Sequence, residues 1–161
     1  MTAMQKKTAE QTPMDHDNYS DDYLQQILSE VKVIAVVGAS SDASRPSHTT
    51  FKALRDVGYE MIPIHPDESV SEMLGQRTYR SLDQIGKPID MVQVFRDPEA
   101  AVDIAKEAIE VGAKVLWMQL GVRNDEAARI AEEAGLKVVM DRCPKIELFR
   151  PYWKDKLNPG F

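Results

Sequence analysis

A group of hydroxyl side chains and one arginine follows the first glycine of the chain. After the apolar run at 33–37 comes Gly38, and the next segment contains Ser40, Ser41, Ser44, Arg45 and Ser47. Serine hydroxyls donate hydrogen bonds to phosphate oxygens, and a guanidinium can bind a phosphate through two parallel hydrogen bonds. A helix is predicted to begin near Pro46, and helix N-termini attract anions. The segment therefore predicts a phosphate site, although one glycine is a weak motif beside the three of the dinucleotide fingerprint.

The second apolar run, at 60–64, bears on the kind of ligand. It is followed by His65, Pro66 and Asp67. Folds that bind NAD generally have an Asp or Glu at the end of this strand, where the carboxylate holds the adenosine ribose. Here His65 and Pro66 occupy that position, and Asp67 follows a proline that turns the chain. The sequence thus disfavours NAD as the ligand.

Apolar runs predict the strands that position these residues. Strands this apolar are buried on both faces, as in a parallel sheet covered by helices. The intervening segments carry helix signals, such as Asp97, Pro98 and Glu99 at one start and Gly112 at its end. We therefore predict an α/β fold with a doubly wound, mostly parallel sheet of five to six strands and helices on both faces. The runs lie at 33–37, 60–64, 90–95, 114–118 and 137–140.

The predicted order of these strands is 3-2-1-4-5-6, and the short stretch 76–79 could supply the edge strand that is third along the chain. A crevice then forms between the first and fourth strands at their carboxyl ends, where open α/β sheets bind ligands. Gly38 lies at one lip of this crevice, and Phe95 and Arg96 lie at the other. An amphipathic helix over 21–31 precedes the first strand.

Composition limits the partners of the protein. The 161 residues carry a formal net charge of −6, and 43% of them are hydrophobic, which is typical of a globular protein with one domain. Binding nucleic acid in general needs a basic face, so we expect no nucleic-acid partner. No apolar run reaches the roughly 20 residues of a membrane-spanning helix. The single cysteine, Cys143, fits a reducing compartment, and we expect a cytoplasmic protein with no membrane partner.

The chain divides into three parts on this evidence. Residues 1–18 are polar and aperiodic, and we expect a flexible tail. Residues 19–148 form the folded domain. Residues 149–161 are aromatic and rich in proline, and we expect them to pack back on the domain or to form a dimer contact.

Residue patterns for catalysis or metal binding are missing from the sequence. The histidines stand at 16, 48 and 65 without ligand spacing, and neither an H-E-x-x-H nor a G-x-S-x-G motif occurs. We therefore predict no catalytic residue and no metal. Arg142 and Lys145 flank Cys143 and raise the hypothesis of a mixed disulfide with a thiol ligand, or of acyl capture. A half-buried, inert cysteine is the simpler interpretation.

Several segments together resemble one family. The chain is similar to the stand-alone bacterial CoA-binding-domain proteins, which in turn resemble the nucleotide-binding domain of the succinyl-CoA synthetase α-subunit. The resemblance runs in order from residue 31 to about residue 148, and the matching segments are VVGAS with RPS, GYEMIPIHP, YRSLDQI, IDMVQVFRDPE, AIEVGAKVLWMQLGV, EAARIAEEAGLKVVMDRC and PKIE.

The resemblance implies that coenzyme A or an acyl-CoA lies across the crevice. It implies phosphate contacts from the first segment, the adenine end near the second strand, and a cleft wall from the fourth. Gln119 and Gly121 either complete the cleft or form a turn, and the turn is favoured for Gly121. The family has asparagine where this chain has His65. The residues implied are Gly38, Ala39, Ser40, Ser41, Arg45 and Ser47 for phosphate, Pro63, His65 and Pro66 for adenine, and Phe95 and Arg96 for the wall.

The function implied is a binding or regulatory module without catalysis of its own, with a possible homodimer or protein partner. The phosphate-carrying histidine of the synthetase belongs to a second domain that has no counterpart in these residues. Two enzyme alternatives stay open, which are a small NAD(P)-linked oxidoreductase and a partner subunit of an acyl-CoA ligase. A third alternative is an interaction protein that has lost its ligand.

Overall fold

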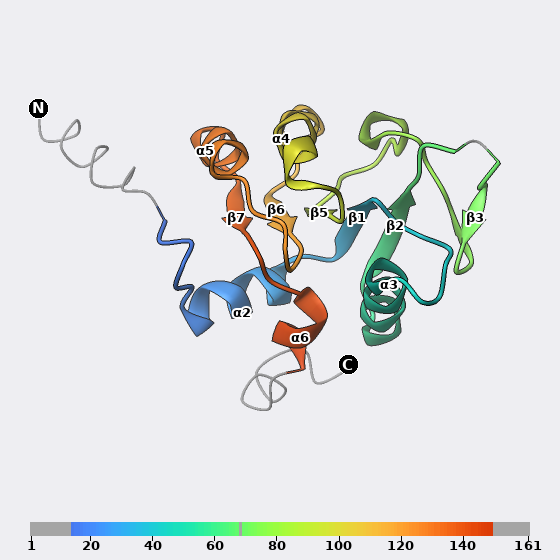
Figure 1. Ribbon diagram of the computed structural model, residues 1–161, viewed down its shortest axis with the longest axis horizontal. Helices are drawn as coiled ribbons and strands as arrows, with labels where there is room; N and C mark the ends of the chain where they lie inside the picture. The colour runs from blue at the N-terminus through green and yellow to red at the C-terminus, as the bar shows by residue number, and fades with distance from the viewer. Residues whose placement is uncertain (1–13, 68, 150–161) are drawn as a thin grey trace, which may run out of the picture.

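A five-stranded parallel sheet lies at the centre of the molecule (Figure 1). The computed structural model describes residues 14–67 and 69–149. All four strand pairings are parallel, which confirms the predicted fold class and, once the third strand is left out, the predicted order. In spatial order the strands are β2 (Glu60–Ile64), β1 (Val33–Val37), β5 (Met91–Val94), β6 (Val115–Met118) and β7 (Lys137–Val139).

Helices cover both faces of this sheet (Figure 1). Each face has its own core, to which a strand contributes alternate side chains, as when Val92 and Val94 face one core and Met91 the other. One face carries α4 (Ala101–Glu110) and α5 (Asp125–Glu133), together with the short 3-10 helices η1 (Leu82–Gln84) and η2 (Pro98–Ala100). The other carries α2 (Asp21–Glu30), α3 (Pro46–Val57) and α6 (Pro144–Leu148).

Side-chain caps start two of the helices, and a third cap that was predicted is missing. Ser20 and Asn124 cap α2 and α5 with their side-chain oxygens, which satisfy backbone N–H groups that the first turn leaves free. Asp97 was expected to cap the helix that precedes α5 in the same way, but its side chain makes no such bond. Its carbonyl instead accepts from Ala100 N at 2.9 Å. The chain therefore enters a 3-10 turn, and α4 begins only at Ala101.

The predicted sixth strand at 76–79 is reduced to a single bridge. Tyr79 N donates to Pro63 O at 3.0 Å, and His65 N donates to Tyr79 O at 2.8 Å. The next parallel hydrogen bond along this edge would need an N–H at position 63, which proline lacks. The residues before Tyr79 instead form β4 (Gln76–Arg77), an antiparallel partner of β3 (Glu72–Met73) in a separate hairpin.

The opposite edge of the sheet, at β7, is closed by two tyrosine hydroxyls. Tyr23 OH donates to Val138 O at 2.8 Å and accepts from Val138 N at 3.0 Å. Tyr19 OH accepts from Met140 N at 2.8 Å. Residues 138 and 140 are two apart, so their outward backbone groups point to the same side of the strand. The leading segment, by which we mean residues 14–31, thus bonds to the edge that another strand could otherwise occupy.

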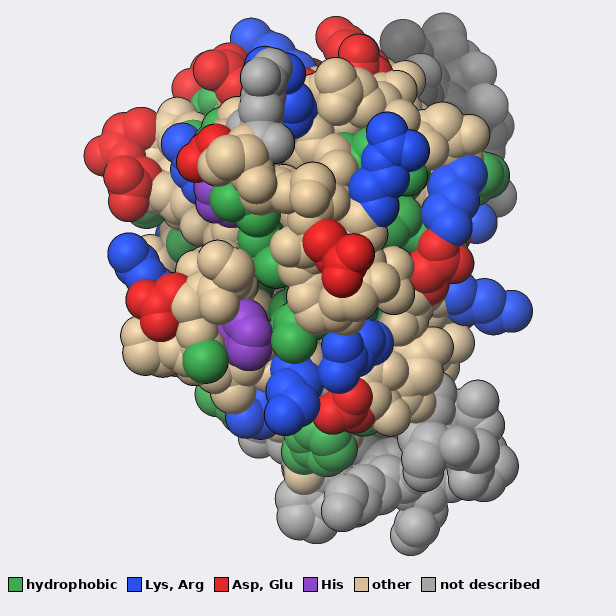
Figure 2. Space-filling view, turned by 90° about the vertical axis from the view of Figure 1, so that its right-hand side faces the viewer, with side chains coloured by type: hydrophobic (Ala, Val, Ile, Leu, Met, Phe, Trp, Pro, Cys, Tyr) green, Lys and Arg blue, Asp and Glu red, His purple; other side chains and the backbone are tan. Residues whose placement is uncertain are grey.

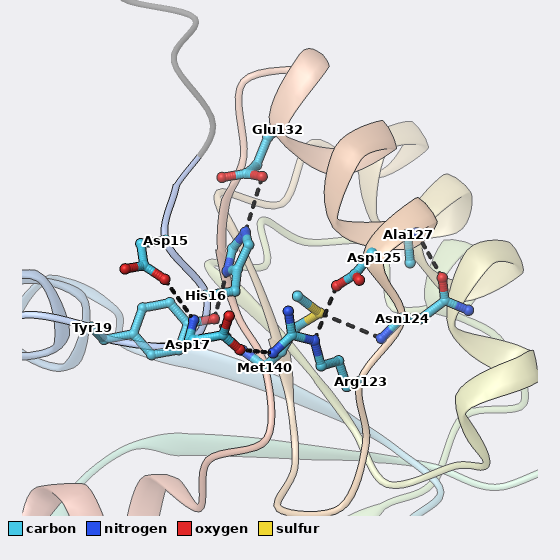
Figure 3. Close-up of polar contacts among 10 residues, drawn as sticks. All are labelled: Asp15, His16, Asp17, Tyr19, Arg123, Asn124, Asp125, Ala127, Glu132 and Met140. Carbon is cyan, nitrogen blue, oxygen red and sulfur yellow. Dashed lines mark hydrogen bonds and ion pairs between the residues drawn. The ribbon is translucent and has the colours of Figure 1, made fainter.

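The start of the leading segment is fastened to α5 and to the residues before it (Figure 3). His16 is hydrogen-bonded to Tyr19 OH at 2.6 Å and to Glu132 Oε1 at 3.2 Å. Arg123 pairs with Asp17 on this segment and with Asp125 at the start of α5. Of the residues predicted as a tail, 14–18 therefore contact the domain. Residues 1–13 and the predicted extension from 150 onward lie outside the described residues.

Candidate functional site

A pocket of about 230 Å³ lies at the carboxyl ends of β1 and β2. Three predicted site residues line it, which are Gly38 after β1, Pro66 after β2 and Arg96 after β5. They come from three separate strand ends, and the parallel sheet brings these ends together at one edge. The other residues of the lining are Val37, Ile64, Arg80, Ser81, Leu82, Ala100, Asp103, Ile104 and Glu107.

Gly38 is required by the crossing of two chain segments at this edge. Its φ is +96°, in the left-handed region that side chains with a Cβ rarely adopt. A Cβ built at this position would lie 2.3 Å from Phe95 O and 3.1 Å from Arg96 Cδ. Phe95 N also donates to Val37 O at 2.8 Å. Gly38 therefore lets the ends of β1 and β5 approach each other, and Arg96 is brought to the pocket as a consequence.

The serine segment after Gly38 is a turn held by its own hydrogen bonds. Asp42 N donates to Ser40 Oγ at 3.1 Å, and both the backbone N and the hydroxyl of Ser44 donate to Asp42 Oδ1, at 2.9 and 2.7 Å. Ala39 is buried in the core, whereas Ser41 is exposed. The side-chain and backbone bonds from Ser44 lower the pKa of Asp42. The segment thus holds an ionised carboxylate beside Arg45, and the Ser44 hydroxyl is already engaged.

Arg45 and Ser47 flank the start of α3 in different environments. Arg45 is exposed and precedes the helix, and its backbone carbonyl accepts from His48 N at 3.1 Å. Ser47 is buried in the first turn. Neither residue lines the pocket beside Gly38. Arg45 is therefore available to an anion at the surface of the loop, while Ser47 lies beneath it.

The end of β2 keeps a local turn through an imidazole. His65 Nδ1 accepts from Asp67 N at 3.1 Å, which is the bond to the second following residue that an asparagine oxygen makes in an Asx turn. Histidine can thus replace the asparagine of the resembled family without loss of this bond. Pro66 is exposed beside the pocket, whereas Pro63 lies inside β2 with its side chain buried.

Two buried glutamines lie behind the ends of β5 and β6. Gln93 Nε2 donates to Gln119 Oε1 at 3.1 Å. Gln93 is 0% exposed, and its Oε1 has no hydrogen-bond partner among the described residues. Sequence reasoning missed Gln93 because it lies within an apolar run. Gly121 forms the favoured turn, in which its N–H donates to Asp141 Oδ1 at 2.7 Å.

Charges of both signs line the pocket. Arg80 and Arg96 contribute guanidinium groups, and α4 contributes Asp103 and Glu107, which are four residues apart and so share one helix face. Burial, followed by the nearby Asp83, Asp103 and Glu110, raises the pKa of Glu107. Arg80 was overlooked as a site residue although it belongs to the quoted segment YRSLDQI. The sequence signal that could have identified Asp103 and Glu107 is their i, i+4 spacing.

Cys143 is enclosed between helices. It is 7% exposed, and its Sγ lies 3.8 Å from Thr50 Oγ1 on α3. This burial fits the inert interpretation rather than a thiol that meets a ligand. Within residues 14–67 and 69–149, no group of three or more potential metal ligands occurs. No helix in the same ranges is long and apolar enough to span a bilayer.

Comparisons with known proteins agree with this architecture. Residues 32–148 match the model of the CoA binding domain family. The chain is 43% identical over 129 residues to the uncharacterized protein YneT of Bacillus subtilis (strain 168), and the match covers 80% of this chain and 94% of YneT.

Two solved structures extend the comparison. A version of the PH1109 protein redesigned for binding is 37% identical, with a TM-score of 0.80, over 88% of this chain and 96% of that one. The dinucleotide-forming acetyl-coenzyme A synthetase 1 of Ca. Korarchaeum cryptofilum shares the fold at 20% identity and a TM-score of 0.62. The match covers 73% of this chain and 28% of the synthetase chain.

Proposed function

Because the chain belongs to the CoA-binding-domain family, we propose that it binds coenzyme A or an acyl-CoA at the carboxyl ends of its parallel strands, as a binding or regulatory module without catalysis of its own. The observation that carries the proposal is the pocket shared by Gly38, Pro66 and Arg96. Each of these residues is also a site residue predicted from the sequence.

The charges of the pocket suit the two ends of such a ligand. The pyrophosphate is anionic, and the guanidinium groups of Arg80 and Arg96 would bind it through charge-assisted hydrogen bonds. The pantetheine arm carries amide N–H groups, which would donate hydrogen bonds to the carboxylate of Asp103. A pocket of about 230 Å³ is smaller than the roughly 300–1,000 Å³ typical of sites that enclose a whole ligand. It would therefore hold one part of coenzyme A, with the rest lying along the sheet edge.

The test is a titration with four nucleotides. The purified protein is titrated calorimetrically with CoA, acetyl-CoA, NAD and NADP, after mass spectrometry of any small molecule released on unfolding. We expect CoA or acetyl-CoA to bind. We also expect Arg96→Gln to weaken binding by about 10- to 100-fold, since a hydrogen bond to a charged group contributes about 1.5–3 kcal/mol.

Two further variants complete the design. Arg45→Ala tests the loop separately from the pocket, and we expect a smaller loss because Arg45 is exposed and outside the pocket. Arg129→Gln is the control, because Arg129 is exposed on α5 and pairs with Glu133 at 2.7 Å. Tight binding of NAD or NADP, together with no binding of CoA, would favour the oxidoreductase alternative. Failure to bind any of the four would overturn the proposal.

A further inference from the structure

The outward side of α6 carries two large apolar side chains, Ile146 and Phe149, which we call the α6 patch. They are 52% and 44% exposed, and a spacing of three residues places them on one side of the helix. The opposite side holds Pro144, Glu147 and Leu148, which are buried where α6 packs against α2 and α3. A helix with apolar side chains all round is normally buried all round. The α6 patch is therefore a candidate docking surface.

One other large apolar side chain is exposed within residues 14–67 and 69–149. Leu120 is 58% exposed, and its loop is bonded to the residues directly before α6. Gly121 N donates to Asp141 Oδ1 at 2.7 Å, and Arg142 N donates to Met118 O at 3.3 Å. The exposed large apolar side chains thus belong to α6 and to the loop beside its start. At the β2 edge, by contrast, Figure 2 shows apolar side chains dispersed among charged ones.

The chain itself supplies an occupant of matching chemistry. Residues 150–161 follow Phe149 directly and have the sequence RPYWKDKLNPGF. Tyr152 and Trp153 come early in this segment, and aromatic side chains bury a large apolar area each. Pro151 lacks an N–H and disfavours helical geometry at the residue before it. We therefore expect the chain to leave the helix axis just after the α6 patch.

Distance and area favour this segment over a second copy of the chain. The four residues from Phe149 to Trp153 reach at most about 14 Å, and Ile146 is only about 4.5 Å from Phe149 along the helix axis. A tethered segment also acts at an effective concentration of the order of millimolar. Two half-exposed side chains offer only part of the roughly 800 Å² that each partner buries in a stable interface.

We propose that residues 150–161 fold back over the α6 patch and place Trp153 against Ile146. The sequence left two alternatives for this segment, packing on the domain or a dimer contact, and the inference selects the first. It also names the surface that the segment covers. The inference does not depend on the proposed function, because neither residue of the α6 patch lines the pocket beside Gly38.

The experiment follows the fluorescence of Trp153. The chain has two tryptophans, and Trp117 is 0% exposed, so subtracting the spectrum of Trp153→Phe from that of the unmodified protein isolates Trp153. We expect acrylamide to quench Trp153 at least about fivefold less than free N-acetyltryptophanamide, because burying one large side chain favours the docked arrangement by about tenfold or more. The shielding should not change with protein concentration, since the contact lies within one chain.

Two matched variants locate the contact. Ile146→Asp places a charge in the α6 patch and should raise the quenching of Trp153 nearly to that of the free compound. Ala134→Asp introduces the same side chain at an exposed position at the end of α5, and it should leave Trp153 shielded. Circular dichroism verifies that each variant is folded. CoA affinity should stay the same in both, so the proposed function is tested separately.

Three outcomes would overturn the inference. Full quenching of Trp153 in the unmodified protein, a measurement that needs no change within the described domain, would mean that the segment does not dock. Shielding that appears only at high protein concentration, with a dimer in sedimentation equilibrium, would assign the α6 patch to a second copy. Shielding that survives in folded Ile146→Asp would place the segment on another surface.

Discussion

Similar residues lie at the two edges of the sheet, but different parts of the molecule cover these edges. At each edge an arginine lies over a tyrosine ring, Arg142 over Tyr19 at 5.6 Å beside β7 and Arg77 over Tyr79 at 5.0 Å beside β2. At β7 the tyrosine hydroxyls bond to the strand, and the leading segment of the chain fills the edge. At β2 the backbone of Tyr79 makes the contact, and a pocket of about 540 Å³ remains beside it.

The difference teaches how to separate structural from binding roles for the same residue types. At β7 Tyr19 is buried and Tyr23 is half-buried, and desolvation raises the pKa of Tyr19 to about 12. Such groups stabilise the fold, since the strand groups bonded to them would otherwise be unsatisfied. At β2, within residues 14–67 and 69–149, the Tyr79 hydroxyl makes no hydrogen bond to the strand, and the neighbouring Arg77 lines a cavity. We infer that changes at β7 act on stability and changes at β2 act on binding.

Gly38→Ala should have the largest effect. Gly38 lies between the two edges of the sheet, where it lets the ends of β1 and β5 approach each other. The left-handed φ and the clash with Phe95 O together predict a loss of about 4 kcal/mol in the free energy of unfolding. The measurement is urea unfolding. Gly112→Ala is the control, since its φ is +76° but nothing lies within 4 Å of the added Cβ, and about 1 kcal/mol is expected. Equal losses for the two variants would contradict the close-approach argument.

The double variant Tyr19→Phe, Tyr23→Phe comes next and tests the closed edge directly. It leaves Met140 N and both backbone groups of Val138 without their partners. We expect the free energy of unfolding to fall by about 3 kcal/mol, since each orphaned group costs about 1–3 kcal/mol and water replaces part of the loss. CoA affinity should stay unchanged. A stable double variant with weakened CoA binding would invert the comparison.

Alkaline pH should weaken the closed edge through Tyr19. The unfolded tyrosine loses its proton near its ordinary value of 10.0, whereas the folded one keeps it until about pH 12. Between these values the folded state binds more protons, so stability falls as pH rises, by about 1.4 kcal/mol at pH 11 for this group. The check is urea unfolding at pH 9, 10 and 11 beside Tyr19→Phe, whose decline should be shallower. Parallel declines would show that Tyr19 does not titrate in this way.

A smaller effect is expected at the pocket beside Gly38. Burial, followed by the neighbouring acids, raises the pKa of Glu107, and when its carboxylate is ionised it repels the phosphates of a bound nucleotide. Glu107→Gln should therefore tighten CoA binding by about two- to fivefold, a modest gain because an exposed charge is screened. Glu133→Gln on α5 is the matched control. Weaker binding after Glu107→Gln would instead indicate that the carboxylate contacts the ligand favourably.

Tyr79→Phe should have the smallest effect and completes the comparison of the edges. Its contacts with β2 come from the backbone, and its ring remains beneath Arg77 after the change. We expect the free energy of unfolding to change by less than about 0.5 kcal/mol, as is usual for surface substitutions. The measurement runs beside the double variant at β7. A loss as large as that of the double variant would mean that both edges depend on tyrosine hydroxyls.

Local patterns predicted the sheet and much of the pocket. They failed where a contact with a distant segment of the chain determined the structure. The apolar runs predicted five strands and their order. The edge strand at 76–79 was largely wrong because a proline on another strand, Pro63, has no N–H to continue the ladder. Arg77 was overlooked because nothing in its own segment indicates that it would face a cavity beside β2.

The sequence by itself determined a parallel sheet with Gly38, Pro66 and Arg96 at its carboxyl edge, because hydrophobic periodicity and chain direction depend on neighbours along the chain. Only the tertiary structure decided what each edge of that sheet became. Tyr23 meets Val138 across 115 positions, and Arg77 faces its pocket only because the hairpin folds beside β2. Contacts of this kind depend on packing between distant segments, and a local pattern carries no record of them.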